Sequence, residues 1–283
     1  AGLPVYKLLG GKIRDRARIY CDTGGGLLLD PNDPTSRYTP ETYAARARQR
    51  KALPDGYTIM KFDIGFHGQH FETVPGSVWE TNMTYPYKDH ATERGIKSQV
   101  EIIDAIKEVL GDEIGLAIDA GPAQSLQASM TLAKALEPYN LVWIEDLLQG
   151  ADNHFFDPDA YRLLSESTST PILAGENGYL RQGFRTLIDQ NAVDIVAPDL
   201  HHCGGIAEFA ELFGVLVAPH NANFSIAFMA NLHAAAVMPR NYIAFEFHLA
   251  DEYPWWEDIL TGVEKPLIKN GFAAVPDNPG LGF

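Results

Sequence analysis

The sequence is poor in cysteine, positive charge and long apolar runs. Its two cysteines, Cys21 and Cys203, cannot form a disulfide framework, which favours a reducing cytoplasm over an extracellular setting. The formal net charge of −15 argues against nucleic-acid and anionic-membrane partners, because both prefer basic surfaces. No apolar run approaches the roughly 18 residues that cross a bilayer. This charge does not exclude an anionic substrate, because a bound metal ion and one or two lysines can reverse the local field at a binding site.

The 283 residues are 46% hydrophobic, which is ample for a large core in one large domain or two small ones. Eight short apolar runs bounded by turn signals predict strands. They are 18–22, 58–64, 115–120, 141–146, 172–176, 195–199, 215–220 and 242–247. Helical spacing of apolar residues is found at 39–51, 97–110, 124–136, 159–167, 178–190 and 206–213. This alternation predicts an α/β fold, specifically a (β/α)8 barrel with a parallel sheet.

Three successive apolar runs, 116–119, 142–145 and 173–176, each end in an acid, at Asp119, Glu145 and Glu176. The carboxyl ends of neighbouring parallel strands lie side by side, so we expect these carboxylates to converge on one small volume. Their mutual repulsion in a desolvated site would force protonation unless a cation is bound. Hard oxygen ligands that leave positions open for water and substrate suit Mg²⁺ better than Zn²⁺. The alternative is that each acid merely ends a strand and faces solvent.

Nearly every predicted strand ends in an ionisable residue. These residues are Asp22, Lys61, Asp63, Asp119, Glu145, Glu176, Asp199, His220 and Glu246. A barrel builds its active site at this face from these positions, so the pattern indicates function.

A long irregular segment at about 65–94 interrupts the alternation and contains His67, His70 and Tyr85. A segment of this length in a compact domain is usually a working loop or disordered. Its aromatic and histidine residues favour a lid or an insert that contacts substrate, and a surface excursion or an oligomer contact is the alternative.

The motifs, taken in order, resemble the mandelate racemase subgroup of the enolase superfamily over essentially the whole chain. Glu145-Asp146 and Gly175-Glu176-Asn177 are similar to its metal-ligand motifs, and Ala197-Pro198-Asp199 with Cys203-Gly204-Gly205-Ile206 looks like its sixth-strand motif. Pro219-His220-Asn221 and Phe245-Glu246-Phe247-His248 look like its seventh-strand and eighth-strand motifs.

The resemblance implies that Asp119, Glu145 and Glu176 bind Mg²⁺ and that the protein removes the proton alpha to a carboxylate through an enediolate intermediate. His220 would be the base, with Asp199 holding its ring. Lys61 would bind the carboxylate or neutralise the enediolate, and Glu246 would hydrogen-bond the carboxylate or orient a neighbour. We also predict substrate contacts for Asp63, His67, His70, Tyr85 and Asn221. For Asp63, the roles of a base, a partner of Lys61 and a structural residue stay open.

The second strand departs from the family pattern, because its Lys-x-Lys motif reads Lys61-Phe62-Asp63 here. A racemase needs acid/base groups on both faces of one centre, so the missing second lysine favours dehydration of a sugar acid to a 2-keto-3-deoxy acid. One histidine can take the alpha proton and then protonate the departing hydroxide on the same face. His67, His70 or Tyr85 could instead supply that acid.

The sequence is also compatible with other reactions. They are racemisation or epimerisation, cycloisomerisation of a sugar-acid lactone, and a non-catalytic relative. A different class is a zinc metallohydrolase, with His201, His202, Cys203 and His220 as ligands, although adjacent histidines point in different directions.

The family also has an α+β capping domain, mostly N-terminal to the barrel. The chain starts near the segment that leads into the first barrel strand, so we expect most of this cap to be missing. We expect 1–266 to form the catalytic barrel and 267–283 to be a C-terminal remnant of the cap. Family resemblance also suggests a homo-oligomer.

Overall fold

A computed structural model describes residues 2–30, 32, 37–64, 93–121, 125–148, 156–199, 205–248 and 254–283. In these ranges, parallel strands alternate with helices along the chain. The strands are β1 (Arg16–Asp22), β2 (Ile59–Asp63), β3 (Gly115–Asp119), β4 (Ile144–Glu145), β5 (Ile172–Ala174), β6 (Ile195–Val196), β7 (Leu216–Val217) and β8 (Phe245–His248). The helices are α1 (Val5–Leu8), α2 (Pro40–Lys51), α3 (Glu93–Leu110), α4 (Leu126–Leu136), α5 (Pro158–Glu166), α6 (Leu180–Asp189), α7 (Ile206–Leu212) and α8 (Ser225–Val237), with a 3₁₀ turn at Glu137–Tyr139.

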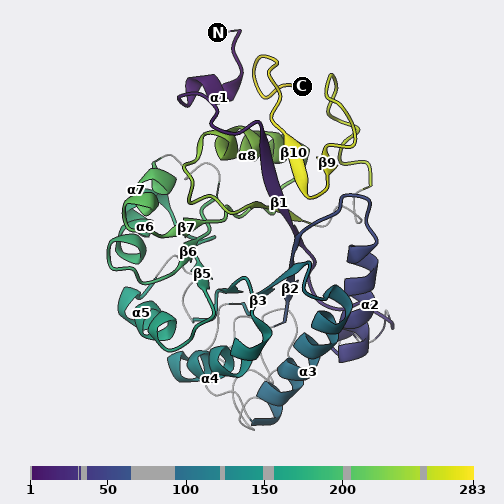
Figure 1. The fold of residues 1–283 in the computed structure, drawn as a ribbon, viewed down its shortest axis with the longest axis vertical. Helices are drawn as coiled ribbons and strands as arrows, with labels where there is room; N and C mark the ends of the chain where they lie inside the picture. The colour runs from purple at the N-terminus through teal and green to yellow at the C-terminus, as the bar shows by residue number, and fades with distance from the viewer. Residues whose placement is uncertain are drawn as a thin grey trace.

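The strands pair in parallel in the order β8-β1-β2-β3-β4-β5-β6-β7. Helices α2 to α7 lie outside the strands (Figure 1). Between β7 and the segment that leads into β8, Val217 forms an isolated bridge with Tyr242, and the Ile243 N–H donates to the Val217 carbonyl (2.9 Å). The predicted α/β class with a parallel sheet is therefore confirmed.

Helix α2 shows how local sequence sets an element boundary. Thr39 caps the helix. Its hydroxyl accepts a hydrogen bond from the Thr42 N–H, and the Thr42 hydroxyl accepts one from the Thr39 N–H. Pro40 follows at the first helical position, where its missing N–H costs no hydrogen bond. The predicted and observed ends of this helix consequently agree within one residue.

Helix α8 was not predicted from the sequence. Most of its 13 residues are buried, and they include Phe228, Met229 and the run Ala234-Ala235-Ala236. A helix that is apolar on all sides shows no stripe of alternating character, so its period is invisible in the sequence. Several strands are also shorter than predicted: the segment 141–146 contributes only β4, Ile144–Glu145.

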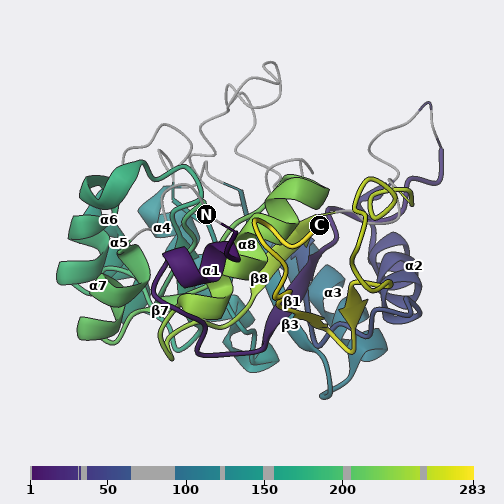
Figure 2. The same cartoon turned by 90° about the horizontal axis from the view of Figure 1, so that it is seen from above.

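The two ends of the chain lie together outside the parallel sheet. The Val5 N–H donates to the Gly280 carbonyl (2.9 Å), and α1 lies beside α8, as both views show (Figures 1 and 2). Strands β9 (Ile268–Lys269) and β10 (Phe272–Ala274) form a hairpin, and β10 pairs antiparallel with the start of β1. No helix in the described ranges is long and apolar enough to cross a membrane.

The core has an inner and an outer part. The outer part lies between strands and helices, where α3 buries Ile102, Ile103 and Ile106. The inner part is a separate cluster to which each parallel strand or its flanking residue contributes. Its members are Tyr20, Ile59, Ala117, Trp143, Leu173, Ile195, Ala197, Ala218 and Ala244. This inner cluster lies directly beneath the candidate site.

Candidate functional site

The site residues follow from the inner cluster by the two-residue period of a strand, which puts residues i and i+2 on the same face. On or just after every parallel strand except β5, a charged or titratable side chain lies two positions after an inner-cluster residue, towards the carboxyl end of the strand. These side chains are Asp22, Lys61, Asp119, Glu145, Asp199, His220 and Glu246. These side chains therefore lie around a common centre at the carboxyl end of the parallel sheet.

Glu176 reaches this centre by a different route, because it lies three residues after Leu173 of the inner cluster. Gly175 has a φ of +126°, a conformation that side-chain-bearing residues rarely adopt. A Cβ there would also lie 2.7 Å from the ring of Phe184. The turn at Gly175 thus brings Glu176 towards the other carboxylates.

The predicted convergence of Asp119, Glu145 and Glu176 is confirmed, because each offers an oxygen within 4.8 Å of the others. Burial raises the pKa of Glu145 well above its usual value. The charge of Lys61 opposes this rise, and the carboxylates of Asp119 and Glu246 add to it. Glu145 Oε1 is buried and has no hydrogen-bond partner in the described part of the chain. Three hard oxygen donors, one of them unpartnered, fit a divalent cation such as Mg²⁺.

Lys61 is a buried cation at the centre of the site. Its Nζ lies 2.9 Å from Glu145 Oε2, 2.9 Å from Glu246 Oε1 and 3.4 Å from Asp119 Oδ2. Burial alone would lower the pKa of Lys61, but Glu145 and Glu246 outweigh it and raise the pKa well above its usual value. Lys61 is therefore charged and held in place by the acids.

His220 and Asp199 form the predicted pair, with 3.0 Å between Nδ1 and Oδ1. The other ring nitrogen, Nε2, faces the carboxylates, 3.6 Å from Glu176 Oε2 and 3.7 Å from Glu246 Oε2. Burial lowers the pKa of His220, but Glu246, the hydrogen bond to Asp199 and Glu176 together raise it to about 10. A cation bound to the carboxylates would offset part of their charge and lower this pKa towards the range of a working base.

Asn221 positions Glu246. Its backbone N–H donates to Glu246 Oε2 (3.1 Å), and its side-chain Nδ2 donates to the Glu246 carbonyl (3.2 Å) and the Asn223 carbonyl (3.1 Å). Its amide nitrogen is thus already engaged by the protein. Substrate binding by Asn221 stays a prediction.

Asp63 lies at the end of β2 and is buried. Its carbonyl accepts a hydrogen bond from the Tyr43 hydroxyl (2.7 Å). Burial raises the pKa of Tyr43 well above its usual value, and the negative charge of Asp63 raises it further. The predicted substrate contact of Asp63 stays a prediction.

Several predicted residues lie outside the described ranges. They are His67, His70 and Tyr85 of the 65–94 insert, and His201, His202 and Cys203 of the zinc alternative.

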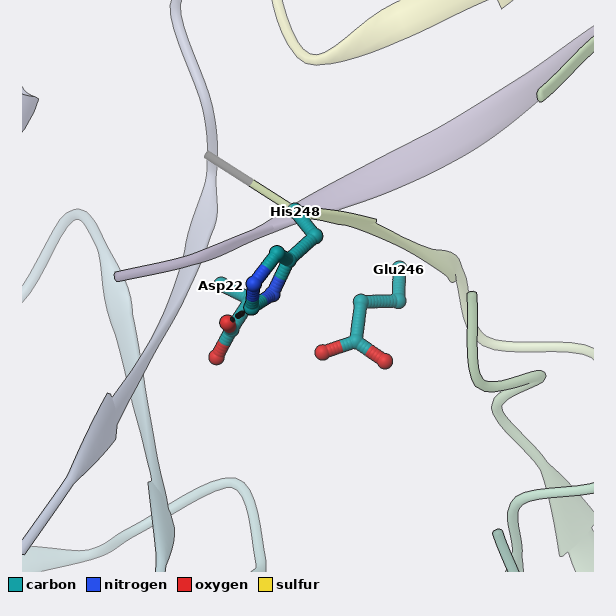
Figure 3. Close-up of side chains that lie close together, drawn as sticks. All are labelled: Asp22, Glu246 and His248. Carbon is teal, nitrogen blue, oxygen red and sulfur yellow. Dashed lines mark ion pairs between the residues drawn. The ribbon is translucent and has the colours of Figure 1, made fainter. Parts of the chain in front are cut away.

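A second histidine–carboxylate pair was missed by sequence reasoning. His248 Nδ1 lies 2.5 Å from Asp22 Oδ2, and both side chains lie beside Glu246 (Figure 3). Asp22 and His248 are partners in the parallel register of β1 and β8, so each ends its own strand. Asp22 was recognised as a strand-end acid, but the pairing of the first strand with the last was needed to connect it to His248.

Comparison with known proteins gives consistent matches across the chain. A family model described as "Enolase C-terminal domain-like" matches residues 42–283. A D-xylonate dehydratase from Haloferax volcanii is 35% identical over 99% of this chain and 62% of the relative. A D-gluconate dehydratase from Thermoproteus tenax is 28% identical over 99% of this chain and 50% of the relative.

Among solved structures, the mandelate racemase/muconate lactonizing enzyme-like protein from Rubrobacter xylanophilus DSM 9941 superposes with a TM-score of 0.82. It is 32% identical over 99% of this chain and 69% of its own length. The chain spans only 50% to 62% of the length of the two dehydratases.

Proposed function

The chain belongs to the mandelate racemase and muconate lactonizing enzyme subgroup of the enolase superfamily, and on that premise we propose that it dehydrates a sugar acid, an aldonate or aldarate, to a 2-keto-3-deoxy acid. The observation that carries this proposal is the His220–Asp199 pair facing three convergent carboxylates, with His220 Nε2 3.6 Å from Glu176 Oε2. Relatives named as D-xylonate and D-gluconate dehydratases support it.

Asp119, Glu145 and Glu176 would hold Mg²⁺. When bound there, the ion supplies positive charge next to the substrate carboxylate, where negative charge develops as the alpha proton leaves. Lys61 adds a fixed positive charge from the second strand, because its ammonium is already held between Glu145 and Glu246. The bound ion and Lys61 would together offset the negative charge of the surrounding acids where the substrate carboxylate binds.

His220 would take the alpha proton at Nε2. Asp199 accepts the hydrogen bond of the Nδ1–H, which fixes the tautomer with its lone pair at Nε2 and stabilises the ring once it is protonated. Glu246, 3.7 Å from His220 Nε2, stabilises the same positive charge. Asp199 and Glu246 thus make the histidine a stronger base without touching the alpha carbon.

We propose that the sheet closes into a (β/α)8 barrel over 1–266, with the bridge between Val217 and Tyr242 as the closing contact. We propose that 267–283 belong to the capping domain, since the β9–β10 hairpin pairs antiparallel with β1 and stands outside the parallel strands.

The test is incubation of the full-length protein with Mg²⁺ and a panel of aldonic and aldaric acids in D₂O. The readouts are 2-keto acid and deuterium at the alpha carbon of recovered substrate. We expect keto acid from at least one acid and its loss in His220→Asn, with Asp159→Asn, a change at an exposed acid of α5, as control. Deuterium or an epimer without keto acid would contradict dehydration and indicate racemisation. A ring-opened product from a sugar-acid lactone would indicate the cycloisomerase.

A further inference from the structure

We propose that His248, held by Asp22, is the general acid that protonates the departing hydroxyl, an inference that rests on the proposed dehydration. His248 would be the catalytic residue and Asp22 a positioning residue. No residue of this pair was needed for the proposed removal of the alpha proton.

The strand geometry directs His248 into the site. It follows Glu246 by two residues on β8, so both side chains leave the strand on the same face. Asp22 is its register partner on β1 and follows Tyr20 of the inner cluster by two residues. Figure 3 shows the His248 ring over Asp22 with the Glu246 carboxylate beside it. The pair therefore lies at the same end of the sheet as the candidate site.

The contact between the two residues leaves one ring nitrogen available. Nδ1 faces the Asp22 carboxylate, 2.5 Å away, whereas Nε2 has no hydrogen-bond or ion-pair partner among the residues that the structure describes. The side chain of Asp22 is 8% exposed and that of His248 is 34% exposed. A buried carboxylate thus orients a histidine whose free edge can reach a ligand.

The arrangement parallels that of His220 and Asp199, and Glu246 lies between the two pairs. Glu246 Oε2 is 3.7 Å from His220 Nε2, and a ligand atom of His248 lies within 4.8 Å of one of Glu246. An elimination needs a base at the alpha carbon and an acid at the beta oxygen. Two separately oriented imidazoles can supply one group each, so that His220 need not return the proton it has taken.

A metal site is the competing interpretation, because Asp22, Glu246 and His248 could together hold a cation. The direct contact between His248 Nδ1 and Asp22 Oδ2 argues against it. At 2.5 Å the two atoms form a hydrogen bond, so they face each other and not an ion between them.

The charged groups around His248 favour its protonated form. Burial lowers the pKa of His248, but the hydrogen bond to Asp22 on β1 and the charge of Glu246 on β8 outweigh it and raise the pKa. Lys61 on β2 acts in the opposite direction. The net effect of these groups is to shift His248 towards its protonated form.

The proposed elimination moves one proton to His220 and one proton away from His248. His220 Nε2 takes the alpha proton, and the electron pair of the broken C–H bond moves onto the carboxylate to give the enediolate. That pair then forms the double bond between the alpha and beta carbons. The beta C–O bond breaks with its electron pair on oxygen, which takes the Nε2 proton of His248 and leaves as water. The resulting enol becomes the keto acid when the proton of its hydroxyl moves to the beta carbon. Solvent then removes the proton from His220 and returns one to His248.

The experiment compares two substrates in wild-type protein, His248→Asn and His220→Asn, all full length with Mg²⁺. One substrate is the panel acid that the wild type dehydrates fastest, and the other is its 3-deoxy-3-fluoro analogue. Fluoride leaves without a proton, so it needs no general acid. We expect His248→Asn to slow dehydration by about 10²- to 10⁴-fold, to keep alpha-deuterium exchange, and to release fluoride at close to the wild-type rate. His220→Asn should lose dehydration, alpha-deuterium exchange and fluoride release.

Asp22→Asn is the second variant, and its readout is the pH profile of kcat. A general acid must be protonated, so activity falls as pH rises through its pKa. Since Asp22 raises the pKa of His248, its loss should move the basic limb of the profile to lower pH. An unmoved limb would contradict the positioning role of Asp22, and this readout is available even if His248→Asn fails to fold.

The remaining outcomes separate the two proposals. Equal loss of water and fluoride elimination in a folded His248→Asn would overturn the general-acid role while leaving the dehydratase intact. Binding of two Mg²⁺ per wild-type chain and one per His248→Asn chain would overturn it in favour of a cation site. A wild-type protein that neither exchanges the alpha proton nor dehydrates any acid would refute the proposed function, and this inference with it.

Discussion

His220 Nδ1 lies 3.0 Å from Asp199 Oδ1, so the segments that follow two neighbouring parallel strands are joined by one hydrogen bond. The contact leaves Nε2 facing the carboxylate cluster. The orientation of the proposed base therefore depends on a residue that would not itself touch the substrate.

Asp199→Asn should lower kcat by about 10²- to 10⁴-fold, because an amide can hold the ring in the wrong tautomer and cannot stabilise its charge. Affinity for Mg²⁺ should change little, since Asp199 is not among the three convergent carboxylates. Steady-state kinetics and Mg²⁺ titration measure the two effects. A kcat close to that of the wild type would remove Asp199 from the mechanism.

Lys61→Met should destabilise the protein as well as inactivate it. The change leaves Glu145 and Glu246 buried without their cation, and breaking a buried pair in this way costs about 3–5 kcal/mol. Urea unfolding in the absence of Mg²⁺ measures the loss, and Lys97→Met, at an exposed lysine of α3, is the control. Added Mg²⁺ should restore part of the stability of Lys61→Met, since the ion replaces the missing positive charge. Equal stability of both variants would contradict a central role for Lys61.

Gly175→Ala should cost about 1–3 kcal/mol of stability, because φ at this position is +126° and the added Cβ would meet the Phe184 ring. It should also weaken Mg²⁺ binding, since the turn at Gly175 brings in Glu176. Thermal unfolding with and without Mg²⁺ measures both effects. Gly183→Ala is the matched control: this glycine lies inside α6 with no contact closer than 3.9 Å, and alanine there should be neutral or slightly stabilising.

The pair of His248 and Asp22 should make stability depend on pH in a defined direction. The folded-state pKa of His248 is raised, so the stabilisation is fully present below about 6.5, its unfolded pKa, and is lost as pH rises through the folded-state pKa. The difference in unfolding free energy between wild type and His248→Asn should therefore shrink on going from about pH 6 to higher pH. Urea unfolding across this range measures it. A difference that grows with pH would contradict the ion pair.

The sequence predicted the parts of this site that depend on one strand at a time. Asp119, Glu145 and His220 each end an apolar run, and the two-residue period of a strand is enough to aim them at one face. Contacts between strands that lie far apart in the sequence could not be predicted in this way. His248 pairs with Asp22 only because the last strand lies beside the first, and nothing local to either residue signals that contact.

Two further features were hidden for physical reasons. Helix α8 is buried on most sides, so it lacks the alternating stripe from which helices are recognised. Asn221 follows His220 directly, but its use of both backbone and side-chain nitrogens to hold Glu246 requires the packing of β8 against the segment after β7.

The central claim is that His220 removes the alpha proton during loss of water. Its most direct test uses the preferred sugar acid labelled with deuterium at the alpha carbon, with release of label and formation of keto acid followed together. We predict that each keto acid formed has lost its label and that His220→Asn produces neither labelled water nor keto acid. Release of label by His220→Asn at the wild-type rate would contradict the account.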